Sequence, residues 1–120
     1  MTLTDALTDH LTLCDDIYQH ALEENRFIQR ERCPPDEPLR ERKLLLSARL
    51  DVSLAALREA TRMPGARGGE LLERARARSL QILHLDRENE QLLLRCSLAP
   101  TRPAVAKPSI RAAQVYASSH

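Results

Sequence analysis

The chain has 120 residues and a formal net charge of +1, and 42% of its residues are hydrophobic but only 2% are aromatic. Aliphatic residues and alanine supply nearly all of the apolar content, and 3 glycines leave little material for the turns of an all-β fold, so the composition predicts one all-α domain. No segment approaches the roughly 20 uncharged apolar residues that span a bilayer, and the N-terminal MTLTDALTDH lacks the features of a signal peptide. We therefore expect a cytoplasmic protein without membrane insertion.

Residues 3–33 form the first periodic segment. Apolar and small residues recur there at steps of four and three: Leu3, Leu7, Leu11, Cys14, Tyr18, Ala21, Asn25 and Ile28. This seven-residue repeat predicts a long helix with one apolar stripe. Thr2 or Thr4 can cap its start, and Pro34 ends it because proline cannot continue a helix.

A second helix is predicted to follow directly. Asp36 is a favourable N-cap, and Pro38 falls in the first turn, where its missing N–H does no harm. The apolar stripe of this helix consists of leucines: Leu39, Leu46, Leu50, Leu54 and Leu57. Met63, Pro64 and Gly65 end it, and the basic, glycine-bearing segment 64–69 is interpreted as a connection rather than a phosphate-binding loop.

A third helix is predicted from about Glu70 to Leu98. Its first stripe contains eight positions: Leu72, Ala75, Ser79, Ile82, Asp86, Asn89, Leu93 and Cys96. Short connections make sequential helices antiparallel, so we expect residues 1–98 to form an elongated up-down bundle of three long antiparallel helices. Residues 99–120 include the proline-bearing APTRPAVAKPS, and they are predicted to be a flexible C-terminal tail.

The third helix carries a second line of leucines as well: Leu80, Leu83, Leu94 and Leu98. This line lies roughly a quarter to a third of a turn from the first stripe, at about 100° per residue. Either it is buried, between the other two helices or beneath the tail, or it is an exposed surface for an amphipathic helix of a partner. Asp86 and Asn89 are, in the same way, either polar residues that fix the helix register or contacts for that partner.

The charge pattern and the reactive side chains exclude several classes of function. Basic and acidic residues alternate along the predicted helices, and no aromatic platform accompanies them, so we expect no nucleic-acid partner. His10 and Cys14 are four residues apart, but a closed metal site would need ligands from other helices. The adjacent carboxylates Asp15 and Asp16 diverge on a helix, and no serine or cysteine has an evident histidine partner. We expect no enzyme, no cofactor and no metal site.

The end of the tail regains a weak helical pattern in SIRAAQVYASSH, residues 109–120. Ile110, Val115 and Tyr116 are its large apolar side chains, and Tyr116 is one of only 2 tyrosines in the chain. An aromatic ring on a tether can bury a large apolar area at a partner. The segment is therefore predicted to dock on another protein.

Four elements together resemble the FlgN family of flagellar export chaperones: the long amphipathic first helix, RKLLLSARLDVSLAAL in the second, LHLDRENEQLLL in the third, and QVYASSH with its tyrosine. The resemblance covers most of the chain. It implies a cytosolic, non-enzymatic chaperone of type III export that binds the terminal helices of hook-filament junction proteins. Such a chaperone delivers its clients to the export gate or export ATPase complex.

The resemblance also suggests which residues act. The third helix would bind the client through five residues: Leu80, Leu83, Asn89, Leu94 and Leu98. Ile110, Val115 and Tyr116 of the tail would engage the export machinery or the client. Two alternatives stay open: a coiled-coil adaptor or self-associating bundle, such as a homodimer, without a client, and a chaperone of another type III secretion substrate.

Overall fold

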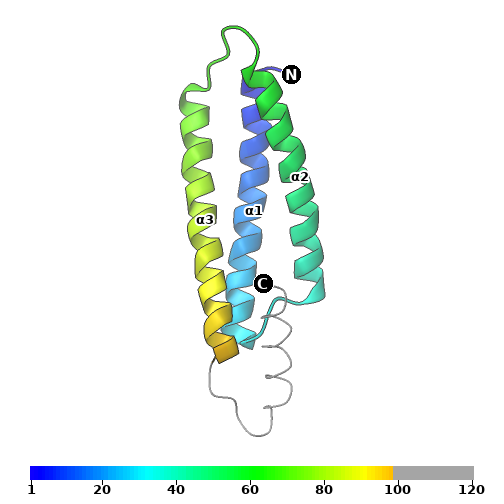
Figure 1. The fold of residues 1–120 in the computed structure, drawn as a ribbon, viewed down its shortest axis with the longest axis vertical. Coiled ribbons are helices and arrows are strands. Elements are labelled where there is room, and N and C mark those ends of the chain that lie inside the picture. The colour runs from blue at the N-terminus through cyan, green and yellow to red at the C-terminus, as the bar shows by residue number, and fades with distance from the viewer. Residues whose placement is uncertain (99–120) are drawn as a thin grey trace, which may run out of the picture.

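The computed structural model describes residues 1–98, which form three α-helices. Helix α1 spans Leu3–Glu31, α2 spans Glu37–Thr61 and α3 spans Gly69–Leu98. Figure 1 shows that they run alternately down and up the length of the molecule. The predicted all-α helical bundle is thus confirmed. Residues 99–120, and with them Ile110, Val115 and Tyr116, lie outside the described part of the chain.

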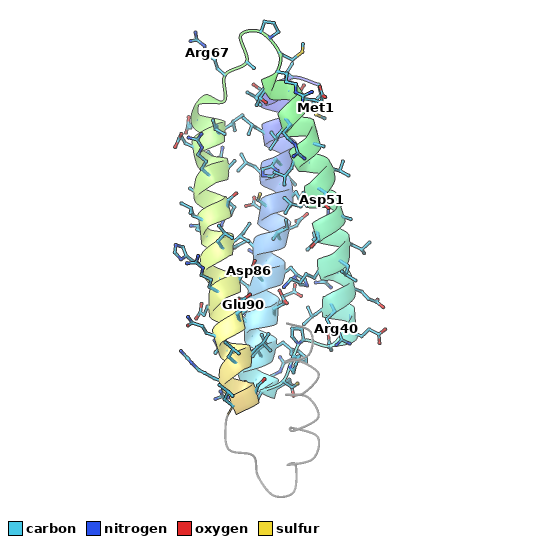
Figure 2. All side chains as sticks on the ribbon, viewed as in Figure 1. Met1, Arg40, Asp51, Arg67, Asp86 and Glu90 are labelled. Atoms are coloured by element: carbon cyan, nitrogen blue, oxygen red, sulfur yellow. The ribbon has the colours of Figure 1, made fainter. Side chains whose placement is uncertain are left out.

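Helix α1 is the central element of the bundle. It packs against α2 on one side and against α3 on the other, whereas α2 and α3 do not pack against each other. Figure 2 shows side chains between α1 and each of its two neighbours. Most of the buried side chains accordingly belong to α1, and α2 buries only Leu46 and Ala60. The bundle is therefore open along the side where α2 and α3 would otherwise meet.

The sequence of α1 explains this central position. The predicted heptad positions Leu7, Cys14, Ala21 and Ile28 are all buried. Beside them runs a second buried line outside the predicted stripe: Ala6, Leu13 and His20. Two adjacent buried lines make a face wider than a single stripe, and such a face can contact two helices at once.

The predicted caps determine where the first two helices begin. Thr2 and Asp5 form a reciprocal capping box, in which each side chain accepts the other residue's backbone N–H at 3.1 Å. Asp36 caps α2 in the predicted way. Helix α1 ends two residues before the predicted limit because Arg32 adopts the left-handed conformation, with φ of 57°, and donates its N–H to Ile28 O at 2.9 Å.

Charged side chains line the edges of both interfaces. On the α3 side, Arg78 Nε lies 3.0 Å from Asp15 Oδ1, and its guanidinium stacks 4.9 Å from the centre of the Tyr18 ring. On the α2 side, Arg42 Nη1 lies 2.8 Å from Glu23 Oε2 in an exposed ion pair. Exposed pairs typically contribute about 0–1 kcal/mol each, so they orient the helices more than they stabilise them.

A buried amide fixes α3 along α1. Asn89 is 6% exposed, and its Nδ2 donates to the backbone oxygen of Ala21 at 3.0 Å. Its Oδ1 accepts a hydrogen bond from Asn25 Nδ2 at 2.9 Å, and Asn25 Oδ1 in turn accepts one from Gln29 Nε2 at 2.7 Å. A shift of α3 along α1 would break both hydrogen bonds of Asn89 in an interior where unpaired polar groups are costly. The geometry thus favours the register role for Asn89.

We expect Asn89→Ala to lower the free energy of unfolding by about 1–3 kcal/mol, because it leaves the partly buried Asn25 amide without its partner. Urea denaturation followed by circular dichroism measures this change. The control is Glu90→Ala at the next, exposed position, for which a change within about 0.5 kcal/mol is expected. Equal losses for the two variants would contradict the register role.

Candidate functional site

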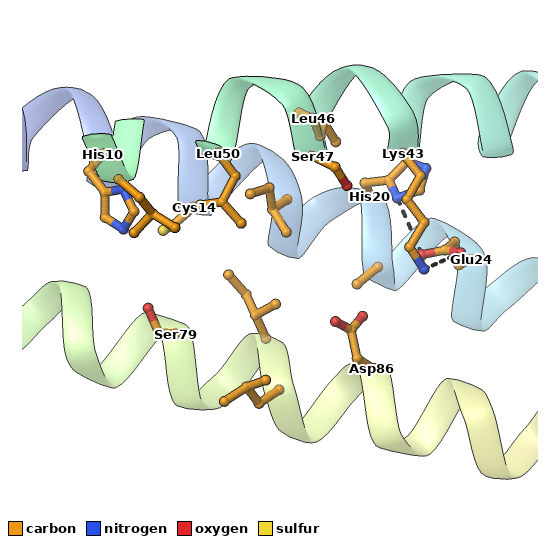
Figure 3. A pocket seen from close by; sticks show the side chains of 15 residues that line it. His10, Cys14, His20, Glu24, Lys43, Leu46, Ser47, Leu50, Ser79 and Asp86 are labelled. Atoms are coloured by element: carbon orange, nitrogen blue, oxygen red, sulfur yellow. Dashed lines mark hydrogen bonds and ion pairs between the residues drawn. The ribbon is translucent and has the colours of Figure 1, made fainter. Parts of the chain in front are cut away.

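An elongated hollow, which we call the α2–α3 groove, lies between the two outer helices with α1 as its floor (Figure 3). Its volume is about 350 Å³. The floor runs from His10 to Glu24, which is roughly 21 Å at 1.5 Å per residue, or about four helical turns. All three helices contribute to its apolar lining: Ile17 and Ala21 from α1, Leu50 and Leu54 from α2, and Ile82 and Leu83 from α3.

The end of the groove nearer the α1–α2 connection is polar. His20 Nδ1 lies 3.3 Å from Glu24 Oε1, and Glu24 Oε2 lies 3.4 Å from Lys43 Nζ, so both carboxylate oxygens of Glu24 have partners. His20 Nε2 lies 2.8 Å from the backbone oxygen of Leu39. Both ring nitrogens of His20 therefore lie close to oxygen atoms, one of Glu24 in α1 and one of Leu39 in α2. The cluster ties α2 to α1 through charged groups.

Asp86 faces this cluster from the opposite wall, and Figure 3 shows its carboxyl pointing from α3 into the groove. The side chain is half-buried, and within residues 1–98 it forms no hydrogen bond or ion pair. Burial raises the pKa of the Asp86 carboxyl, against the attraction of Lys43 and His20, and the negative charge of Glu90 raises it further. Asp86 is thus an acceptor without a donor in a mostly apolar wall.

The other end of the groove is less charged. His10 Nδ1 lies 2.7 Å from Ser53 Oγ, and burial lowers the pKa of His10, which favours the neutral ring. Burial likewise raises the pKa of the Cys14 thiol, with a smaller contribution from Asp15. Among residues 1–98, no group of three or more His, Cys, Asp or Glu side chains is placed to hold a metal ion. No helix in the same range combines the length and apolar character of a membrane span.

The second leucine line of α3 lies at the surface. About half or more of each side chain is exposed: Leu80 by 58%, Leu83 by 57%, Leu94 by 48% and Leu98 by 81%. These residues, called the α3 leucine line from here on, are not buried between α1 and α2. Leu83 lines the groove, whereas the other three are not among its lining residues.

Asn89, which the resemblance grouped with these leucines, lies apart from them. It is buried between α1 and α3, with both ends of its amide engaged by α1. An amide in this position is not presented to a partner. We therefore assign Asn89 to the support of α3, and the remaining four residues to an exposed surface.

Sequence reasoning missed the floor and the α2 wall of the groove. It placed Leu50 and Leu54 in the core stripe, yet Leu54 is 40% exposed because α3 does not cover α2. The available signal was the second apolar line of α1, which indicates a helix with two neighbours. That signal does not show which pair of helices stays apart.

A second hollow lies between α1 and α2 and has a volume of about 410 Å³. Its apolar residues include Ala6, Leu13, Ala48 and Val52. Val52 is highly exposed, and so is Leu45 one helical heptad before it. Helix α2 therefore has apolar residues on two edges, one toward the α2–α3 groove and one away from it.

Comparison of the chain with protein-family models, curated proteins and solved structures found no match.

The pKa shift of Asp86 predicts a pH-dependent effect of Asp86→Asn. A raised pKa means that folding favours the protonated carboxyl, so the contribution of Asp86 to stability is largest below its ordinary pKa of 3.8 and is lost as the pH rises through the raised value. Asparagine carries no charge at any pH. We expect Asp86→Asn to melt at a higher temperature than the wild type at pH 7, with the difference shrinking toward pH 3.

Thermal melts of both proteins across this pH range measure the effect. Glu88→Gln, at an exposed position of α3, controls for the loss of one negative charge. An Asp86→Asn variant that is less stable than the wild type at pH 7 would show that the carboxylate is stabilised by its surroundings.

Proposed function

We propose that the protein is a non-enzymatic chaperone that binds an amphipathic helix of a client in the α2–α3 groove. The single observation that carries this proposal is that α2 and α3 both pack on α1 but not on each other. The result is the α2–α3 groove, which is about four helical turns long, with α1 as its floor and α2 and α3 as its walls. A helix bound in the α2–α3 groove would complete a four-helix bundle, in which the axes of neighbouring helices are typically about 8–10 Å apart.

The exposure of the groove rim supports this proposal. The α3 leucine line places four large apolar side chains in water, and Leu83 joins that line to the groove. Full burial of one leucine stabilises a complex by about 1.5–3 kcal/mol, so a partner helix that covers several of them gains substantial binding energy. Apolar surfaces of this kind on helical proteins commonly receive the apolar face of a partner helix.

The resemblance to the FlgN family supports a more specific form of the proposal. In that form the protein acts in the cytoplasm, its clients are the hook-filament junction proteins, and it binds their terminal helices before type III export. Delivery to the export gate or export ATPase complex would then involve Ile110, Val115 and Tyr116, which lie outside the described residues. A client of another type III secretion system would use the same groove.

The second candidate function is self-association without a client. Leu45 and Val52 on the far edge of α2, with the hollow between α1 and α2 beside them, favour it, because two copies could bury these edges against each other. This surface faces away from the α2–α3 groove. The two functions are therefore separable by mutation.

We expect Leu83→Asp to weaken binding of a purified hook-filament junction protein by at least about tenfold, since loss of an apolar anchor and burial of a charge exceed 1.4 kcal/mol. The melting temperature should change little because Leu83 is exposed. Calorimetric titration measures binding, and thermal melts measure stability. The matched control is Leu45→Asp, an equivalent change at a residue 68% exposed on the far edge of α2.

Each outcome has a distinct meaning. Binding lost in Leu83→Asp and kept in Leu45→Asp supports the chaperone. A dimer in sedimentation experiments that Leu45→Asp dissociates, together with no client binding by the wild type, supports self-association. Unfolding of Leu83→Asp would place Leu83 in the core and refute the groove.

A further inference from the structure

We infer that the helix bound in the α2–α3 groove carries an arginine or lysine at one end of its apolar face, and that this cation pairs with Asp86. The inference rests on the proposed function, because it specifies the ligand of the same groove. It assigns to Asp86 the selection of the partner, and it sets the position of the cation within the partner's sequence.

The hydrogen bonding of the groove distinguishes Asp86 from its neighbours. Glu24 already has His20 on one oxygen and Lys43 on the other, so it needs no further donor. Asp86 lines the same polar end and has no partner among residues 1–98. The positive charge of Lys43 attracts it, but Lys43 is held at Glu24 across the groove. An additional donor at this end would therefore go to Asp86.

Covering the groove makes such a donor necessary. In the free protein the Asp86 side chain is only half-buried, so its carboxylate is still accessible to water. A helix laid over the groove removes this water, and a buried carboxylate without a partner is strongly unfavourable. A cation on the incoming helix offsets this cost, and arginine is best suited because its planar group pairs with both oxygens of a carboxylate. A helix with only apolar residues at this point is disfavoured.

The place of Asp86 sets the sequence pattern of the partner. Ile82 and Leu83 lie one turn before it on α3, and Leu50 and Leu54 lie on the α2 wall toward the less charged end. The partner's apolar residues at steps of three and four would contact these side chains over about four turns. The cation would lie in the terminal turn next to Asp86, which is the last turn of a partner parallel to α3 and the first turn of an antiparallel one. In Figure 2, Asp86 and Glu90 lie along the same edge of α3, so negative charge continues beyond that end of the groove.

The test is a selection from a displayed library of helices of about 18 residues, long enough to span the groove. Their inward positions are randomised among Leu, Ala, Gln, Glu, Lys and Arg. The full chain serves as bait in four forms: wild type, Asp86→Asn, Asp86→Lys and Glu88→Gln. Glu88→Gln removes one negative charge two residues from Asp86. Position 88 is exposed and lies on a different side of the helix from Asp86.

The wild type and Glu88→Gln should enrich Arg or Lys at one inward position in a terminal turn. This preference should disappear with Asp86→Asn and change to Glu with Asp86→Lys. The best arginine peptide should bind the wild type at least about tenfold more tightly than its glutamine counterpart, and bind Asp86→Asn about equally in both forms. Melting curves of the four baits confirm that each is folded.

Two results would overturn the inference. Enrichment of apolar helices with no preference for a cation would refute the pairing with Asp86 while leaving the proposed function in place. No enrichment of any helix by the folded wild type would refute both the inference and the proposed function.

Discussion

The packing of α1 on two sides is the constraint on which the rest of the structure depends. Its adjacent buried lines, one through Leu7 and Cys14 and one through Leu13 and His20, give each outer helix a surface. Neither outer helix then needs the other, and the apolar residues on their facing edges stay uncovered. The groove is thus a consequence of how apolar residues are distributed over α1. It forms without any strained backbone or unusual loop at its rim.

Polar groups give this apolar arrangement its precision. Hydrophobic contact alone leaves helices free to slide by a turn, because leucine contacts are interchangeable. Asn89 removes that freedom on the α3 side through Ala21 and Asn25, and His20 does so on the α2 side through Leu39. Both sets of hydrogen bonds join an outer helix to α1. Helices α2 and α3, the walls of the groove, are consequently held at defined positions along α1, although they do not pack against each other.

Much of the fold could be predicted from the sequence, because its determinants are local. The caps at Thr2 and Asp36 depend only on neighbouring residues, and the three helices follow from the spacing of apolar residues along each segment. The groove could not be predicted, since Leu54 has the same spacing whether or not α3 covers it. The exposure of Leu80 and the other leucines of its line was one of two alternatives. Only the arrangement of the helices shows that the line is exposed rather than buried, because exposure depends on tertiary contacts.

The sparse burial of α2 has a consequence for motion. Helix α2 buries only Leu46 and Ala60, packs less extensively on α1 than α3 does, and is joined to α1 by three ion pairs where α3 has one. Segments with little buried surface open at lower free energy than the rest of a protein. We expect the amide hydrogens of α2 to exchange with solvent sooner than those of α1. A low opening free energy would let the wall that contains Leu50 and Leu54 adjust its distance from α3, and in the proposed complex this would admit client helices of different diameter.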